Sequence, residues 1–243
     1  IDTIVYFISS KLYEQDYTIS KNYYSEELIL CDSLCTCYPS LKIDSNFESR
    51  ETLGFTKQMN IYSCLQASFK ITEFMEDIIS NILEKDKNGI VLLSVAFAPF
   101  SKTQLIRFYK KMDKNSSRIK FYKTLSLNEY LNLVNISDIV LDTYPFGGCN
   151  SSLEAIHLGK PIITFPSNKL SGRFTYGFYN YIDFKELIVG SKEDYINIVI
   201  KLTSNLEFKN KCIDTIKKNR YKLFNDKKSI KEWEEIICRL SST

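Results

Sequence analysis

The regular alternation of short apolar runs with amphipathic segments beyond Asn60 is the feature that most constrains the fold of this chain. Such alternation is typical of βαβ units, in which parallel strands form a sheet that helices cover on both faces. The run 91–96 is almost continuously apolar, which indicates a strand buried on both faces in the middle of the sheet. The predicted strands are Asn60–Leu65, Ile90–Ala96, Ile119–Tyr122, Ile139–Asp142 and Pro161–Phe165.

Helical periodicity fills the spaces between these strands and continues after the last one. The helices predicted between strands are Thr72–Leu83, Lys102–Met112, Leu127–Val134 and Ser151–Leu158. Apolar residues at three- and four-residue spacing then predict three more helices that cap the sheet and pack back across its edge. These are Glu193–Thr203, Leu206–Tyr221 and Lys228–Leu240. The sequence therefore predicts an α/β fold, a doubly wound parallel sheet with C-terminal helices.

The length of 243 residues allows one complete α/β domain with flanking structure, but not two full-sized lobes. We assign residues 56–243 to this domain and residues 1–55 to a linking segment, with strand-like runs at Thr3–Phe7 and Glu27–Cys31. Because the chain enters at Ile1 directly on a strand-like run, we expect that a further segment precedes it.

Charge and apolar content exclude several kinds of partner. Lys and Arg number 32 against 29 Asp and Glu, so the balance favours neither nucleic acid nor an anionic membrane, and any anion site must be local. No stretch approaches the roughly 20 apolar residues of a membrane span. The seven irregularly spaced cysteines indicate free thiols in a reducing compartment, and we expect a cytoplasmic protein. Cys31, Cys35 and Cys37 come closest to a zinc cluster, but with a single histidine we expect no metal.

The loop 144–152 carries the strongest chemical signal in the sequence. In a doubly wound sheet, ligands bind beyond the carboxyl ends of the strands, where free N–H groups at helix N-termini attract phosphate. Gly147 and Gly148 let the backbone approach a ligand closely. The same segment also fits a capping box, in which Ser151 caps the helix and Glu154 returns to its backbone. Taken alone, the loop favours the capping interpretation.

A longer pattern changes that balance. A strand ending in Leu-Asp is followed by a loop with Pro and Gly, two small polar residues, an acid and Gly-x-Pro before another apolar strand. The chain carries it as Leu141-Asp142, Pro145, Gly147-Gly148, Ser151-Ser152, Glu154 and Gly159-Lys160-Pro161. This pattern resembles the donor-binding signature of O-linked N-acetylglucosamine transferases and SPINDLY-like proteins, inverting glycosyltransferases with the two-lobed GT-B fold. The resemblance covers roughly residues 25–240 and implies that this chain is the C-terminal, donor-binding lobe.

Two further matches extend the resemblance. Gln66 is followed four residues later by Lys70, and Arg173 stands at the head of a helix after the last strand. The resemblance implies that Lys70 stabilises the leaving nucleotide as the catalytic cation and that Arg173 is a second phosphate partner. The implied donor-binding residues are Gln66, Tyr130, Gly147, Gly148, Asn150, Ser151, Ser152, Glu154 and Arg173.

Each implied role has a structural alternative. Tyr130, which the resemblance places against uracil, is equally readable as a core or surface tyrosine. Glu154 would accept hydrogen bonds from the ribose hydroxyls or serve the capping box. Lys70 could be a solvated residue at a helix start, although a cation there opposes the helix dipole. Cys149 stands where some relatives carry histidine, and Leu127 and Leu133 replace basic residues that flank the uridine in animal relatives, which leaves the nucleotide open.

Three functions are compatible with these observations. The first is inverting transfer from a UDP-sugar, UDP-N-acetylglucosamine being the first choice, to an acceptor hydroxyl such as a protein Ser or Thr, with the acceptor-facing N-terminal lobe outside this chain. No Asp-x-Asp triplet is present, so we expect no metal cofactor, and we expect His157 to pack rather than act as a base. The second is a non-catalytic nucleotide-sugar-binding module. The third is an unrelated doubly wound protein, which would need a Gly-x-Gly-x-x-Gly turn that the sequence lacks.

Overall fold

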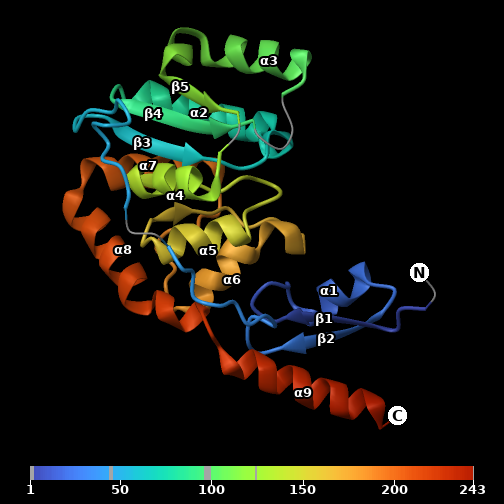
Figure 1. The fold of residues 1–243 in the computed structure, drawn as a ribbon. Helices are drawn as coiled ribbons and strands as arrows, with labels where there is room; N and C mark the ends of the chain where they lie inside the picture. Colours follow the sequence, from blue (N-terminus) through green and yellow to red (C-terminus); the bar gives the residue numbers. More distant parts are fainter. Residues whose placement is uncertain (1–2, 44–45, 96–99, 124, 243) are drawn as a thin grey trace.

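A five-stranded parallel sheet organises most of the chain (Figure 1). The computed structural model describes residues 3–43, 46–95, 100–123 and 125–242. The strand order is β5-β4-β3-β6-β7, with every neighbouring pair parallel, which confirms the predicted doubly wound α/β sheet. The strands are β3 (Asn60–Cys64), β4 (Gly89–Ser94), β5 (Ile119–Tyr122), β6 (Ile139–Leu141) and β7 (Ile162–Ile163). Ala96, the predicted end of β4, lies outside the described residues.

The order of the strands creates one reversal in the sheet. From β3 the chain moves outward through β4 to β5, and it then returns to place β6 on the other side of β3. All six residues of β4 are buried, as its continuous apolar run predicted, and β4 lies inside the sheet between β5 and β3. The switch point of the topology is therefore the crevice between β3 and β6, where open α/β sheets bind ligands.

Helices cover both faces, as right-handed crossovers require (Figure 1). One face carries α2 (Glu73–Lys85), α3 (Lys102–Met112) and later α7 (Lys192–Ser204), which packs beside α2. The other carries α4 (Leu127–Ile136) and α5 (Asn150–His157). These predicted helices are confirmed to within about two residues at each end.

Periodicity did not predict α6 (Phe174–Tyr181), although the resemblance implied a helix headed by Arg173. Its sequence is rich in aromatic residues and contains Gly177, and both types have low helix propensity. Tertiary packing holds the helix instead, because Gly177 lies directly against the Tyr13 ring. A Cβ at position 177 would come within 2.4 Å of that ring, so the close approach depends on glycine.

A second, smaller sheet forms from the first residues. The strands β1 (Tyr6–Ser10) and β2 (Glu27–Cys31) pair in parallel, with α1 (Tyr17–Ser20) between them. The strand-like run Glu27–Cys31 is confirmed, whereas the run Thr3–Phe7 is shifted by three residues toward the C-terminus. The segment predicted as a linker thus has ordered structure of its own, beside the five-stranded sheet (Figure 1).

The last helix, α9 (Lys227–Ser241), lies under this small sheet (Figure 1). The prediction that it packs across the edge of the main sheet is wrong, although α7 and α8 (Leu206–Asn219) do stay with that sheet. The Glu232 carboxylate accepts hydrogen bonds from the backbone N–H groups of Asp32 (3.2 Å) and Ser33 (3.0 Å). Ile236 packs in a cluster with Ile29 and Cys31. The helix is held there because it satisfies amides that follow β2 and covers its apolar residues.

Within the described ranges, no helix combines the length and the apolar character that a membrane crossing demands.

Candidate functional site

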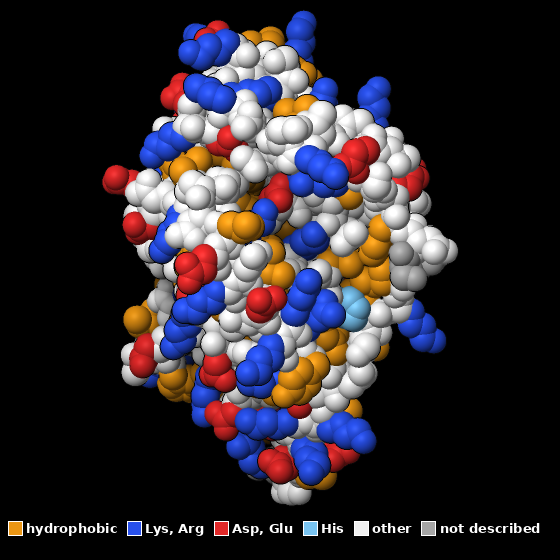
Figure 2. Space-filling view, turned by 90° about the vertical axis from the view of Figure 1, so that its left-hand side faces the viewer, with side chains coloured by type: hydrophobic (Ala, Val, Ile, Leu, Met, Phe, Trp, Pro, Cys, Tyr) orange, Lys and Arg blue, Asp and Glu red, His pale blue; other side chains and the backbone are white. Residues whose placement is uncertain are grey.

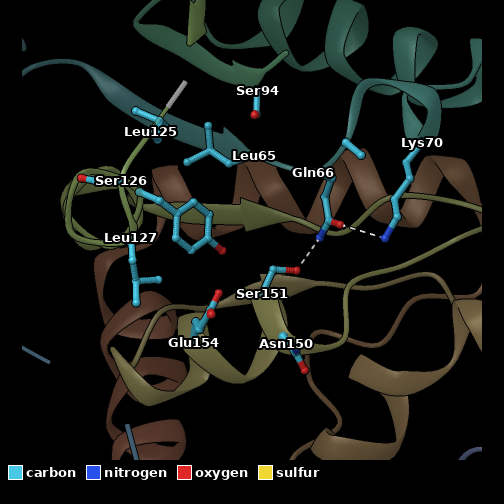
Figure 3. Close-up of a pocket in the computed structure, with 12 residues that line it drawn as sticks. Leu65, Gln66, Lys70, Ser94, Leu125, Ser126, Leu127, Asn150, Ser151 and Glu154 are labelled. Carbon is cyan, nitrogen blue, oxygen red and sulfur yellow. Dashed lines mark hydrogen bonds between the residues drawn. The ribbon is translucent and has the colours of Figure 1, made fainter. Parts of the chain in front are cut away.

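A cavity of about 460 Å³ opens at the switch point, beyond the carboxyl ends of β3 and β4 (Figure 3). Its walls come from the segment after β3, the end of β4, the start of α4 and the first turn of α5. Six of the predicted site residues line it: Gln66, Lys70, Tyr130, Asn150, Ser151 and Glu154. The topology thus brings together side chains far apart in the chain, such as Gln66 and Ser151, which are 85 residues apart.

A short turn after β3 positions the lysine. The 3-10 turn Ser68–Lys70 precedes α2, so Lys70 does not open the helix as expected; Glu73 is its first residue. The Lys70 ammonium donates hydrogen bonds to the carbonyl oxygen of Gly147 (2.7 Å) and to Gln66 Oε1 (3.2 Å). Gln66 Nε2 in turn donates to Ser151 Oγ at 3.0 Å (Figure 3). This relay ties the turn, the glycine loop and α5 into one unit.

The Lys70 charge meets mostly neutral partners. Burial lowers the pKa of its ammonium, while the buried Asp142 carboxylate and the Cys149 thiol oppose that shift. The ammonium also lies 3.8 Å from the centroid of the Phe146 ring, a cation–π contact. Lys70 is half-buried, so the alternative of a solvated lysine is wrong. Because carbonyl and amide oxygens do not neutralise it, its charge stays available to an anion in the cavity.

The glycine loop is anchored from below by Asp142. This buried carboxylate accepts hydrogen bonds from the Gly148 N–H (2.7 Å) and from the Thr164 hydroxyl (2.8 Å). Burial raises the pKa of Asp142, and the hydrogen bonds from Gly148 and Thr164 and the charge of Lys70 oppose the rise. Sequence reasoning used Asp142 only as part of a motif and missed this role. The available signal was an acid placed directly after a buried strand.

Close packing explains why position 148 is glycine. A Cβ built there would lie 2.5 Å from Ser152 Oγ, 2.6 Å from Gln66 Nε2 and 2.7 Å from Ser151 Oγ. At Gly147 a Cβ would lie 3.1 Å from both Asp142 carboxylate oxygens. Neither glycine lines the cavity; both shape the backbone that supports it.

The capping-box interpretation of α5 is wrong. The helix begins at Asn150, with Cys149 as its N-cap residue, and no side chain caps it. Ser151 lies inside the first turn and accepts from Gln66, while Ser152 is buried against the Thr175 hydroxyl at 2.7 Å and does not reach the cavity. The positive end of the helix dipole therefore has no side-chain cap, and two residues of this first turn, Asn150 and Ser151, line the cavity.

Tyr130 and Glu154 form the opposite wall, and each affects the pKa of the other. Burial raises the pKa of Tyr130 well above its ordinary value, and the charge of Glu154 and the hydrogen bond to it act in the same direction. Burial also raises the pKa of Glu154, and the hydrogen bond from Tyr130 opposes that rise. Tyr130 packs on the core with one side and faces the cavity with the other, so it is not a surface tyrosine.

Arg173 lies away from the cavity. It is the N-cap residue of α6, and its guanidinium donates to the backbone carbonyls of Tyr13, Ser167 and Glu14. It also stacks on the Tyr176 ring at 4.5 Å. These contacts brace the loop after β1 against α6, and a phosphate role for Arg173 stays a prediction.

Three other expectations from the sequence concern His157, the pair Leu127 and Leu133, and a metal site. His157 packs edge-on against the Phe224 ring, with centroids 5.1 Å apart, as expected for a packing residue. Leu127 lines the cavity, but Leu133 belongs to a buried cluster below the sheet. Among the residues that the structure describes, no group of three or more His, Cys, Asp or Glu side chains is arranged to hold a metal ion. Metal independence itself stays a prediction.

Sequence reasoning missed much of the apolar wall. Leu65 and Ala67 follow β3, Leu125 and Leu127 flank Ser126 at the start of α4, and Ser94 ends β4. Their common signal is position, because each lies at the end of a parallel strand, in the segment after one or at the start of the next helix. Periodicity assigns such residues to strand ends and loops without indicating which of them face the same cavity.

Known proteins match both the sequence and the fold. The sequence pattern of Glycosyl transferase family 41 matches residues 37–233. The UDP-N-acetylglucosamine–peptide N-acetylglucosaminyltransferase of Caenorhabditis elegans is 24% identical over 140 residues, which are 57% of this chain and 12% of that protein. The corresponding enzyme of Giardia intestinalis is 25% identical over 150 residues, 61% of this chain and 10% of that protein. The matched part is thus about a tenth of each relative's length.

Solved structures give the same fold. The chain superposes on an O-GlcNAc transferase of Thermobaculum terrenum with a TM-score of 0.79 at 19% identity, covering 97% of this chain and 44% of that one. A pneumococcal O-GlcNAc transferase in complex with UDP and GlcNAc gives a TM-score of 0.62 at 12% identity, covering 100% of this chain and 46% of that one. In both cases the chain corresponds to less than half of the solved protein.

Proposed function

Because the chain belongs to Glycosyl transferase family 41, we propose that it binds a UDP-sugar, UDP-GlcNAc, and transfers the sugar with inversion to an acceptor hydroxyl. Its five-stranded sheet is the Rossmann-like lobe of a GT-B glycosyltransferase. UDP as the nucleotide is supported by the pneumococcal structure, which holds UDP and GlcNAc. A protein Ser or Thr as acceptor is supported by the names of the relatives, which are peptide N-acetylglucosaminyltransferases.

One observation carries this proposal. Lys70 projects into the switch-point cavity with its charge held by neutral oxygens, next to the uncapped first turn of α5. A fixed cation and a helix N-terminus at one place are suited to a diphosphate. We therefore assign the donor diphosphate to the space between Lys70, Asn150 and Ser151.

The rest of the cavity suits the nucleoside. Glu154 would accept hydrogen bonds from the ribose hydroxyls, because its carboxylate lies on the wall one turn beyond the phosphate position. Tyr130 and the neighbouring leucines would enclose the uracil ring with apolar surface. Gln66 would keep Lys70 and Ser151 in register while lining the same site.

The reaction needs negative charge stabilised on the departing group. The acceptor oxygen attacks the anomeric carbon, the bond from that carbon to the diphosphate oxygen breaks, and the electron pair leaves with UDP. Lys70 and the helix N-terminus would stabilise this charge without a metal. The acceptor proton would pass to a base on the N-terminal lobe, which we propose as the partner that completes the site. A cytoplasmic location is part of the proposal, supported by the free cysteines of the described residues.

The proposal is tested by calorimetry with UDP, in EDTA and in manganese. We expect the same affinity in both. Glu154→Gln should weaken UDP binding by about 1 to 2 kcal/mol, the scale of a hydrogen bond to a charged group, and leave the melting temperature near parental. The exposed Glu84→Gln serves as control and should change neither. Binding that requires manganese, or parental affinity in Glu154→Gln, contradicts the assignment. Donor binding without transfer or donor hydrolysis, in a protein that carries both lobes, would instead support the non-catalytic module.

A further inference from the structure

A second cavity, of about 270 Å³, lies at the amino end of the sheet. Its wall is formed by residues that precede β6 and β7 and by one side of α8. Three lysines line it: Lys160 from the loop before β7, and Lys209 and Lys217 from α8. Because the donor cavity lies at the carboxyl ends of the same strands, the two cavities occupy opposite ends of the sheet and share no lining residue.

The one carboxylate in this lining is already shared. Asp138 accepts from Lys209 Nζ at 2.6 Å, from the Arg50 guanidinium at 2.5 Å and from the Ile61 N–H at 2.9 Å. Among the ion pairs of the described residues, none involves Lys160 or Lys217. Asp138 is thus the one acid whose charge stabilises the Lys160 ammonium, against three cations that repel it, Lys209, Lys217 and Arg50.

The two lysines without ion pairs are held close together by packing. Gly159 has a positive φ of +73°, and a Cβ there would lie 2.7 Å from Lys217 Cγ and 2.8 Å from Lys217 Cε. The stem of Lys217 therefore lies directly against the backbone next to Lys160. Lys160 itself is half-buried, and burial lowers its pKa to about 8, with Lys209, Lys217 and Arg50 lowering it further and Asp138 opposing. Figure 2 looks onto the side of the molecule that carries α8, where Lys and Arg side chains gather.

We propose that this cavity binds a small, free oxyanion of the phosphate class that carries more than one negative charge. The ammonium group of lysine is a compact point charge with three donors, which suits phosphate oxygens. A multivalent anion between Lys160, Lys209 and Lys217 would compensate the charge that Asp138 leaves unbalanced. It would also add to the favourable charge that the desolvated Lys160 ammonium now receives from Asp138 alone.

The probe for this site is inorganic pyrophosphate, measured by calorimetry at pH 7 with a melt of each protein. Because the donor cavity should also accept a diphosphate, we follow the binding event that remains in Lys70→Met. We expect this event to weaken roughly tenfold or more when Lys160→Met or Lys217→Met is added, since each removes a charge-assisted contact. Lys218→Met, an exposed neighbour on the same helix, is the matched control and should bind as the parent does. Binding should also weaken between pH 7 and 9, because Lys160 loses its proton there.

The variant Lys70→Met distinguishes binding at this site from binding in the donor cavity. It should still bind pyrophosphate at this site. Binding that is lost in Lys70→Met but kept in Lys160→Met places the anion in the donor cavity and overturns the proposal. Equal binding in the parent and all lysine variants, or none in the parent, also overturns it. A lipid headgroup is distinguished with vesicles that contain a phosphorylated inositol lipid. Binding to these vesicles without binding of free pyrophosphate contradicts a site for a free ligand, and none of these outcomes depends on UDP.

Discussion

The two ends of the main sheet each hold a half-buried lysine, and they treat its charge in opposite ways. At the carboxyl end, Lys70 is held by a backbone carbonyl, an amide oxygen and an aromatic ring. At the amino end, Lys160 faces Lys209, Lys217 and Arg50, and the one nearby carboxylate is already paired. Neutral dipoles fix a cation in position without cancelling it, whereas burial, reinforced by repulsion from like charges, brings the pKa of Lys160 down to about 8. The same sheet thus carries one cation that is positioned and another whose charge varies with pH.

The largest effect should come from removing the positioned cation. Lys70→Ala should lower turnover by about a hundredfold or more in a protein that carries both lobes, because a removed electrostatic donor of this kind has that effect on rate. The melting temperature should stay near parental, since the lost partners are neutral groups beside a cavity. Steady-state transfer, measured beside a thermal melt, checks both. Lys110→Ala, an exposed substitution on α3, is the control. Near-parental turnover in folded Lys70→Ala would contradict the role of Lys70 in catalysis, and with it the difference between the lysines at the two ends of the sheet.

A smaller effect should follow from disturbing the dipoles around Lys70. Gly148→Ala places a Cβ against Ser152 Oγ, Gln66 Nε2 and Ser151 Oγ at 2.5 to 2.7 Å, so the side chains of the relay must move. We expect UDP affinity to fall about tenfold and unfolding free energy to fall by roughly 1 to 3 kcal/mol, the range for overpacking. Gly190→Ala is the matched control, because its Cβ meets nothing within 4 Å. Calorimetry and denaturant unfolding of both variants decide the matter; equal losses in both would contradict a specific role for position 148.

The smallest effect concerns the pH-dependent cation. The folded-state pKa of Lys160, about 8, lies below its ordinary value of 10.5. Between these two pH values, Lys160 is mostly deprotonated in the folded protein and mostly protonated in the unfolded chain. The free energy of unfolding therefore gains nothing from Lys160 well below pH 8 and increases as pH rises toward the unfolded-state pKa. The increase is about 1 kcal/mol from pH 7 to 9. Lys160→Met should lack this part of the pH dependence, and Lys218→Met should keep it. Identical pH dependence of unfolding in the parent and Lys160→Met would mean that the pKa of Lys160 is not lowered in the folded protein.

Sequence periodicity predicted the strands of the main sheet well because each is a short, buried run between amphipathic helices. β5 and α3 match the predicted bounds at both ends. It missed α6, whose aromatic sequence and Gly177 disfavour a helix except when Tyr13 packs against it. It also misplaced α9, because the amphipathic stripe of a helix shows that a face is buried but not which partner buries it.

The candidate site was predictable where the chain is continuous and unpredictable where it is not. The segment 141–154 carries its motif in sequence order, and so does the pair Gln66 and Lys70. The link from Gln66 to Ser151 spans 85 residues, and only the strand order places those residues together. The Arg173 guanidinium donates hydrogen bonds to the backbone carbonyls of Tyr13 and Glu14, which lie 159 or more residues earlier in the chain. No local sequence pattern encodes such contacts.

The contacts between Glu232 and the amides after β2 also set an order of events in folding. Glu232 and Ser33 are 199 residues apart in the chain, so closing the loop between them is slow compared with pairing β3 with β4. During synthesis, β1 and β2 leave the ribosome long before α9 is made. The apolar residues of these strands that α9 covers therefore remain exposed to solvent while the main sheet assembles. The small sheet therefore depends for its completion on the rest of the chain having been made, and a polypeptide that stops before residue 232 leaves those amides and Ile29 without their partners.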